Sequence, residues 1–90
     1  IARWEGSGIK TTEPFYVPGD FRVSWSASGI VRDGYDVFQI MVYENGDLHS
    51  VAANYMGLDT TDVSYIYTDD GSFHLVINST MNWIVVVEAR

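Results

Sequence analysis

The sequence predicts an all-β protein: an antiparallel β-sandwich of about seven or eight short strands, jelly-roll or CUB-like, in a single domain over residues 1–90. Three observations lead to this prediction. β-Branched and aromatic residues occur in short runs, Gly, Asn and Asp separate those runs, and the helical spacing of apolar residues is nearly absent. Hydrophobic residues make up 47% of the 90 residues, enough for a dense core in so short a chain.

The first two predicted strands lie in the amino-terminal third. In "EPFYVPGD", Pro14 and Pro18 bracket a short strand, which we expect at a sheet edge because proline cannot donate to a ladder. In "DFRVSWSA", Phe21, Val23 and Trp25 alternate with polar residues, so one face of this strand is buried and the other is wet.

The middle of the chain predicts a hairpin. Residues 35–43, "YDVFQIMVY", are apolar on both faces apart from Gln39 and indicate an interior strand. Asn45-Gly46 follows, and both residues tolerate the positive φ of a type I′ turn. The return strand is expected in "LHSVAAN", residues 48–54.

Two further returns are predicted near the carboxyl end. "DVSYIYT" is expected to turn at Asp70-Gly71 into "SFHLVIN" as a second hairpin. Trp83 to Val87 then form a final strand that is apolar on both faces. Asn78-Ser79-Thr80 between them has the form of a glycan acceptor, with Asn78 as the glycosylated residue, but such a triplet often arises by chance and a tight return between two core strands explains it better.

Charge and composition exclude several classes of function. Twelve acidic residues against five basic ones give a net charge of -7, and the single lysine leaves no basic cluster for nucleic acid or anionic lipid. No apolar run approaches the ~20 residues that cross a bilayer. The absence of cysteine excludes disulfides, thiolate metal sites and thiol nucleophiles. Cations and neutral polymers remain as ligands, and a start at Ile1 suggests excision from a longer, secreted precursor.

Three stretches together resemble a known type of module: "WEGSGIKTTEPFYVPGDFRVSW", "FQIMVYENGD" and "GSFHLVINSTMNWIVVVE". They are similar to small bacterial and archaeal extracytoplasmic β-sandwich modules, often found behind a membrane anchor or a zinc-ribbon segment. The matching positions are Gly6, Gly8, Lys10, Thr11, Phe15, Val17, Gly19, Asp20, Trp25, Gly71, Phe73, Leu75, Ile77, Asn78, Ser79 and Trp83. The resemblance implies a sandwich at the cell surface or outside the cell. It implies no catalytic residue, and this chain lacks the paired cysteines of some such sequences.

Candidate catalytic and metal-binding residues are sparse. His49 and His74 fall mid-strand, where a solvated surface position is the simplest interpretation, and no spacing places a base beside a nucleophile. Loop carboxylates suit Ca²⁺, which takes six to eight oxygen ligands. The candidates form two pairs: Asp33 with Asp36 and Asp59 with Asp62. Glycoside hydrolysis also uses paired carboxylates, but a 90-residue sandwich rarely leaves a cleft for it.

Aromatic residues supply the candidate ligand contacts. Trp25 and Trp83 fit the buried face of their strands and are expected in the core. Trp4 lies outside any clear strand, and Tyr65 and Tyr67 would share one face of theirs. These three rings are the predicted binding residues, because exposed aromatics stack on sugars and anchor interfaces.

The function expected from these features is non-enzymatic: a cell-surface or extracellular module for recognition, adhesion or structural support, with a protein or a polysaccharide as partner. Two alternatives remain. One is a self-assembling subunit of a filament or surface layer, in which "IARWEGSG" or "WIVVVEAR" pairs with a neighbour's sheet edge. The other is a calcium-assisted carbohydrate-binding module.

Overall fold

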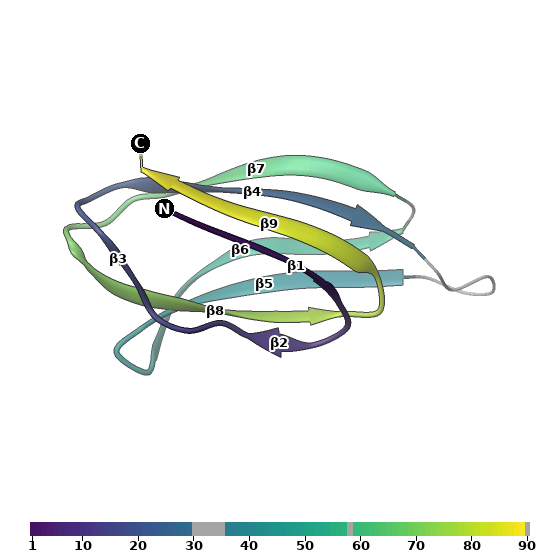
Figure 1. Cartoon of the computed structure of the whole chain (residues 1–90), viewed down its shortest axis with the longest axis horizontal. Helices are drawn as coiled ribbons and strands as arrows, with labels where there is room; N and C mark the ends of the chain where they lie inside the picture. Colours follow the sequence, from purple (N-terminus) through teal and green to yellow (C-terminus); the bar gives the residue numbers. More distant parts are fainter. Residues whose placement is uncertain (30–35, 58, 90) are drawn as a thin grey trace.

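The computed structural model describes residues 1–29, 36–57 and 59–89, and within them the chain forms nine strands and no helix (Figure 1). The strands are β1 (Ala2–Ser7), β2 (Lys10–Thr11), β3 (Phe15–Val17), β4 (Phe21–Ser28), β5 (Asp36–Glu44), β6 (Asp47–Gly57), β7 (Thr60–Ile66), β8 (Gly71–Ser79) and β9 (Asn82–Ala89). The all-β prediction is confirmed. The count exceeds it because β1 and the two-residue β2 precede the first strand that alternation marks.

The strands form two antiparallel sheets packed face to face, which confirms the predicted sandwich (Figure 1). Sheet A has the order β1-β9-β4-β7, and sheet B has the order β2-β8-β5-β6, with β3 also paired to β8. Both chain ends lie at the same end of the sandwich, where the amino group of Ile1 donates to the carbonyl of Val87 at 2.9 Å (Figure 1). No helix among the described residues is long and apolar enough to span a bilayer.

The Asn45-Gly46 hairpin is confirmed, and the second predicted hairpin is wrong. Asn45 and Gly46 have φ of 51° and 87°, and they join β5 to its sheet neighbour β6. At Asp70-Gly71 the chain leaves β7 in sheet A and enters β8 in sheet B. Gly71 lacks the positive φ of a primed turn, so β8 does not fold back on β7.

The expected return at residues 78–82 also crosses between sheets. β8 runs through Ser79 and β9 begins at Asn82, so only Thr80 and Met81 connect sheet B to sheet A. The hydroxyl of Ser79 accepts from the backbone amide of Met81 at 2.8 Å, and the amide of Thr80 donates to the carbonyl of Val37 at 3.0 Å. The bond to the Ser79 hydroxyl closes this connection, and the bond from Thr80 to Val37 continues the β8–β5 ladder of sheet B by one residue.

The core lies between the sheets and is rich in aromatic residues. β4 alternates strictly between buried and half-buried positions, as predicted, and the side chains of Trp25 and Trp83 are buried. Ring contacts connect the two layers: Phe21 of sheet A lies 5.3 Å from Phe73 of sheet B, and Trp25 lies 4.7 Å from Phe38. β3, bracketed by its prolines, lies at an edge of sheet B as expected.

Candidate binding surfaces

The outer face of sheet A carries an elongated hollow along β4. Three successive outward positions of this strand are serines, and the register sets larger side chains beside them on both neighbouring strands. Small residues between taller ones leave a depression, which we call the serine trough. Its residues are Ser24, Ser26 and Ser28 on β4, Ile84, Val86 and Asn82 on β9, Thr61 on β7, and Glu5 and Ser7 on β1.

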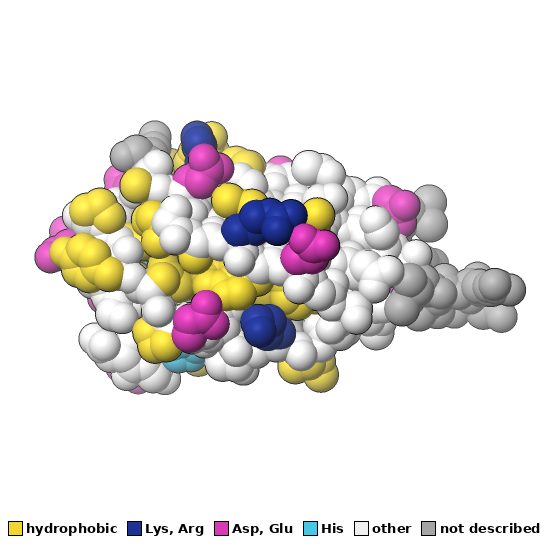
Figure 2. Space-filling model, viewed as in Figure 1, with side chains coloured by type: hydrophobic (Ala, Val, Ile, Leu, Met, Phe, Trp, Pro, Cys, Tyr) yellow, Lys and Arg dark blue, Asp and Glu magenta, His cyan; other side chains and the backbone are white. Residues whose placement is uncertain are grey.

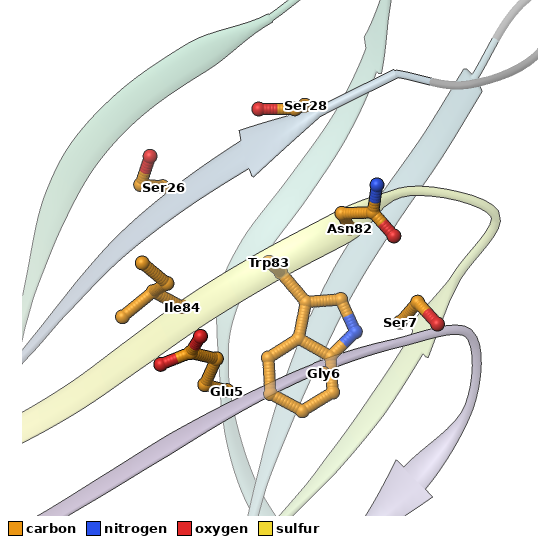
Figure 3. A pocket seen from close by; sticks show the side chains of 8 residues that line it. All are labelled: Glu5, Gly6, Ser7, Ser26, Ser28, Asn82, Trp83 and Ile84. Atoms are coloured by element: carbon orange, nitrogen blue, oxygen red, sulfur yellow. The ribbon is translucent and has the colours of Figure 1, made fainter.

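The trough consists of two adjoining, shallow parts. The larger, of about 350 Å³, lies at the end of the sandwich remote from the chain termini (Figures 1 and 3). The smaller, of about 150 Å³, shares Ser26 and Ile84 with it and continues toward Val86. Alternate residues of a strand are about 7 Å apart, so the three serines span about 14 Å. A hollow of this shape suits a chain polymer better than a compact molecule.

Some of the polar side chains in the trough have a partner, and three are free to bind a ligand. Thr61 Oγ1 donates to Ser26 Oγ at 3.4 Å. Within the described parts of the chain, the side chains of Ser24, Ser28 and Asn82 form no hydrogen bond to one another or to other residues. Ile84 supplies an apolar surface beside them, and 37% of this residue is exposed. The trough thus combines hydroxyl and amide groups with an aliphatic wall.

The charges on the outer face of sheet A form pairs. Arg3 contacts Glu5 at 3.0 Å on β1, and Arg22 contacts Glu88 at 3.1 Å across β4 and β9. The hydrogen bond from Arg22 lowers the pKa of Glu88 and raises that of Arg22 itself. On the side of the molecule that Figure 2 shows, Lys and Arg side chains also lie close to Asp and Glu side chains. The trough is therefore bordered by neutral pairs rather than by a field of one sign.

Trp83 supports the remote end of the trough from below. Its indole lies against Gly6, where an added Cβ would stand 3.5 Å from the ring (Figure 3). Its N–H donates to the carbonyl of Gly8 at 3.1 Å, which ties β9 to the connection after β1. The contact of the Trp83 ring with Gly6 helps to keep β1 in register with β9 beside the trough.

The predicted contacts Tyr65 and Tyr67 are exposed and lie together. Their exposed fractions are 48% and 65%. Both line a groove of about 430 Å³ between the edge strands β6 and β7, together with His49, Ser50, Val51, Ser64 and Ile66. Tyr65 also stands opposite Arg22 in the β4–β7 register, so it borders the same face as the trough.

Trp4, the third predicted contact, is buried, and that prediction is corrected. β1 pairs with β9 and turns Trp4 inward, opposite Val85, while Arg3 and Glu5 point out. The ring lies 5.6 Å from Phe15, and its N–H donates to Glu13 Oε1 at 3.0 Å. Only 8% of the residue is exposed, so the ring cannot stack on a ligand. The alternation of Arg3, Trp4 and Glu5 indicates a strand and was the overlooked signal.

The three described carboxylates proposed for calcium each accept a hydrogen bond, and two of them, Asp36 and Asp59, lie beside Gly29. Asp33 lies outside the described residues, and Asp36 is buried and accepts from Thr80 Oγ1 at 3.3 Å. Asp59 accepts a hydrogen bond from the backbone amide of Gly29, and Asp62 accepts one from the backbone amide of Val63. Across the described ranges no three Asp, Glu or His side chains are grouped closely enough to hold an ion. The structure gives these aspartates other hydrogen-bond roles.

The histidines do not meet across a sheet. His74 lies on the outer face of sheet B and stacks on Tyr43, with ring centroids 5.2 Å apart. His49 lies at the β6 edge, where its Nδ1 is 3.1 Å from Ser50 Oγ and its ring meets the edge of Phe73. In the described structure no carboxylate hydrogen-bonds the His49 ring, so this histidine–serine contact lacks the third group of a catalytic triad.

Asn78 is exposed but belongs to a strand rather than to a turn. It lies on β8, and its amide donates to Gln39 Oε1 at 3.2 Å. Gln39 in turn donates to Asn54 Oδ1 at 3.2 Å, which makes a row of three amides across sheet B. A glycan on Asn78 would break this row; whether one is attached stays a prediction.

Comparison of the chain with models of protein families, with curated proteins and with solved structures gives no match. The resemblance to extracytoplasmic modules therefore stays a prediction. Sequence reasoning also missed the serine trough. Its signal was present in "RVSWSAS", where every outward position after Arg22 is a serine, but the taller neighbours follow only from the register.

Proposed function

We propose that this chain is a non-enzymatic recognition module at the cell surface or outside the cell, and that it binds a neutral polysaccharide in the serine trough. The observation that carries the proposal is the row of three outward serines on β4, set between Ile84 and Val86 on one side and Thr61 on the other. Hydroxyl and amide groups can bond sugar hydroxyls, and aliphatic walls can cover the apolar faces of sugar rings.

Charge supports a neutral ligand. With a net charge of -7, the protein repels an anionic polymer, and this repulsion acts over about a Debye length at physiological salt. The paired charges beside the trough add no local cationic site that would reverse the effect. A neutral chain of sugars meets neither attraction nor repulsion, and its binding should depend little on salt.

Two features support a binding role over catalysis. The described residues contain no grouped acids or histidines of the kind that metal-assisted hydrolysis uses. Among the described residues the trough holds one carboxylate, Glu5, and that group is paired with Arg3. Paired acid and nucleophile carboxylates, which glycoside hydrolysis needs, do not face each other there.

The placement outside the cell rests on the family resemblance and on acidity, which favours solubility. The position of the trough is compatible with a surface module, because its larger part lies at the end opposite the chain termini (Figure 1). A molecule held by either terminus would present the trough outward.

The test is a binding panel on protein immobilised through its amino terminus. We expect soluble neutral polysaccharides to bind, anionic ones to bind more weakly, and EDTA to have no effect. Ser26→Tyr fills the centre of the trough and should abolish binding, because the new ring occupies the space between Ile84 and Thr61. Ser72→Tyr makes the same change at an exposed position of β8 in sheet B and should leave binding intact.

The assembly alternative receives less support in its terminal-strand form. β9 has β1 on one side and β4 on the other, so residues 83–87 pair within their own chain and offer no free backbone edge. β1 pairs with β9 along one edge, so only its other backbone edge could pair with a neighbouring molecule. Exchange of "WIVVVEAR" would require sheet A to open.

A further inference from the structure

On β5, β6 and β8, the outward positions of sheet B that the structure describes carry no acidic or basic side chain. Outward and inward positions alternate along the three main strands, and β5, β6 and β8 each have four outward positions. None of these twelve residues is Asp, Glu, Lys or Arg. Leu48, Val51 and Met56 on β6 have exposed fractions of 56%, 56% and 63%. Beside them Met41 and Val76 continue the apolar surface across β5 and β8.

We propose that this face is a dimer interface, and that its partner is a second copy of the same chain. Charge favours the identical partner. Two molecules with net charge -7 repel each other, so they can approach closely only through surfaces that lack acidic groups. The outer face of sheet A carries Glu5 and Glu88, whereas the outward positions of sheet B on β5, β6 and β8 carry no acid.

The amide row makes the face self-complementary. Asn78 donates to Gln39, and Gln39 donates to Asn54, so the row crosses the sheet perpendicular to its strands. Each amide carries both donors and acceptors, and the two bonds within the row use only part of them. If a two-fold axis lies along this row, the amides of one copy face the amides of the other, and apolar side chains meet on both sides of the row. The same patch of each copy then forms the contact, as an isologous interface requires.

The size of the face fits a weak, reversible dimer. Strands about 4.8 Å apart and residues rising about 3.4 Å give three strands with four outward positions each an area of about 400 Å². Two copies would bury about 800 Å² in total, which is the size of a weak, transient contact. Stacked sheets commonly pack in this way, about 10 Å apart.

The experiment is sedimentation equilibrium of the whole chain over a wide concentration range, at low and at high salt. We expect a monomer–dimer equilibrium that shifts toward the dimer at high salt, because salt screens the repulsion between the acidic molecules. Asn54→Asp and Gln39→Glu each place a carboxylate in the face on both copies. Each should weaken the dimer about tenfold or more, since like charges would then face each other across the interface.

Asn82→Asp is the matched control, because it makes the same chemical change on an exposed residue of sheet A. It should leave the dimer affinity nearly unchanged, and circular dichroism would verify the fold of all three variants. A wild-type chain that stays monomeric at every concentration and salt level overturns the proposal. So does a dimer that Asn82→Asp weakens as much as Asn54→Asp and Gln39→Glu do.

Discussion

Thr12 joins the short edge strands of sheet B to the interior strand β8. The residue is 5% exposed, its backbone amide donates to the carbonyl of Leu75 at 2.9 Å, and its Oγ1 accepts the amide of Leu75 at 3.0 Å. The side chain thus replaces a backbone carbonyl where regular pairing ends after Thr11. One hydroxyl satisfies a buried donor that would otherwise lie unpaired.

Removal of this hydroxyl should destabilise the fold. Thr12→Val keeps the shape but leaves the amide of Leu75 unpaired and buried, so we expect a loss of about 1–3 kcal/mol of unfolding free energy in urea denaturation. Thr11→Val, at the exposed neighbouring position, is the control and should change stability by less than about 0.5 kcal/mol. Equal effects of the two substitutions would contradict this role for Thr12.

Two glutamates make stability depend on acid. Hydrogen bonds from its own backbone and then from the Trp4 indole lower the pKa of Glu13 below its ordinary 4.5, and the Arg22 guanidinium lowers that of Glu88. The folded chain therefore favours the ionised carboxylates more than the unfolded chain does. The resulting stability is complete above pH 4.5 and is lost as the pH falls through the lowered pKa values.

We expect the urea concentration at the unfolding midpoint to decrease as the pH is lowered through that range. In the double variant Glu13→Gln with Glu88→Gln, the decrease should be smaller. The amides keep the size of the carboxylates but do not titrate. Urea titrations at a series of pH values below neutrality measure the effect. Identical acid dependence in the wild type and the double variant would show that other groups are responsible.

Single residues show where sequence reasoning succeeded. Trp25 and Trp83 were predicted in the core because each belongs to a clear apolar run, and both are buried. Trp4 was misplaced because its strand is amphipathic only through two charged neighbours, and its burial depends on pairing with β9 from the far end of the chain. Tyr65 and Tyr67 are exposed as expected, but their common groove depends on β6, which local patterns do not reveal.

At the scale of elements, the β5–β6 turn sets the register of an edge strand. Gly46 has φ of 87°, a conformation that a side chain makes costly. Gly46→Ala should therefore lower the unfolding free energy by roughly 1–2 kcal/mol. Gly19→Ala is the control, because Gly19 has an ordinary φ and no atom within 4 Å of an added Cβ. Comparable losses in the two variants would show that the turn does not require a left-handed residue.

Strand positions followed well from the sequence, but two of the connections between them did not. Alternation located β4, and the prolines located β3 at an edge. Asp70-Gly71 and residues 78–82 have the composition of tight turns, which a hairpin and a crossing between sheets share. Composition cannot separate the two, because the choice depends on φ at Gly71 and on which strands the following segment pairs with.

At the scale of the whole molecule, the two outer faces have different chemistry. Sheet A presents the serine trough between ion pairs, and sheet B presents an uncharged face crossed by an amide row. Back-to-back faces allow both proposals at once: a dimer formed through sheet B leaves two troughs pointing outward. Bivalent display of this kind raises avidity for a polymer without any new contact.

Amide chemical shifts can locate a polysaccharide in the trough residue by residue. Isotope-labelled protein would be titrated with the neutral polysaccharide that binds best in the panel, and perturbed amides would be mapped on the structure. We predict shifts concentrated at residues 24–28 of β4 and 82–86 of β9, with little change on β5 and β8. Shifts confined to sheet B, or none with any neutral polysaccharide, would contradict binding in the trough.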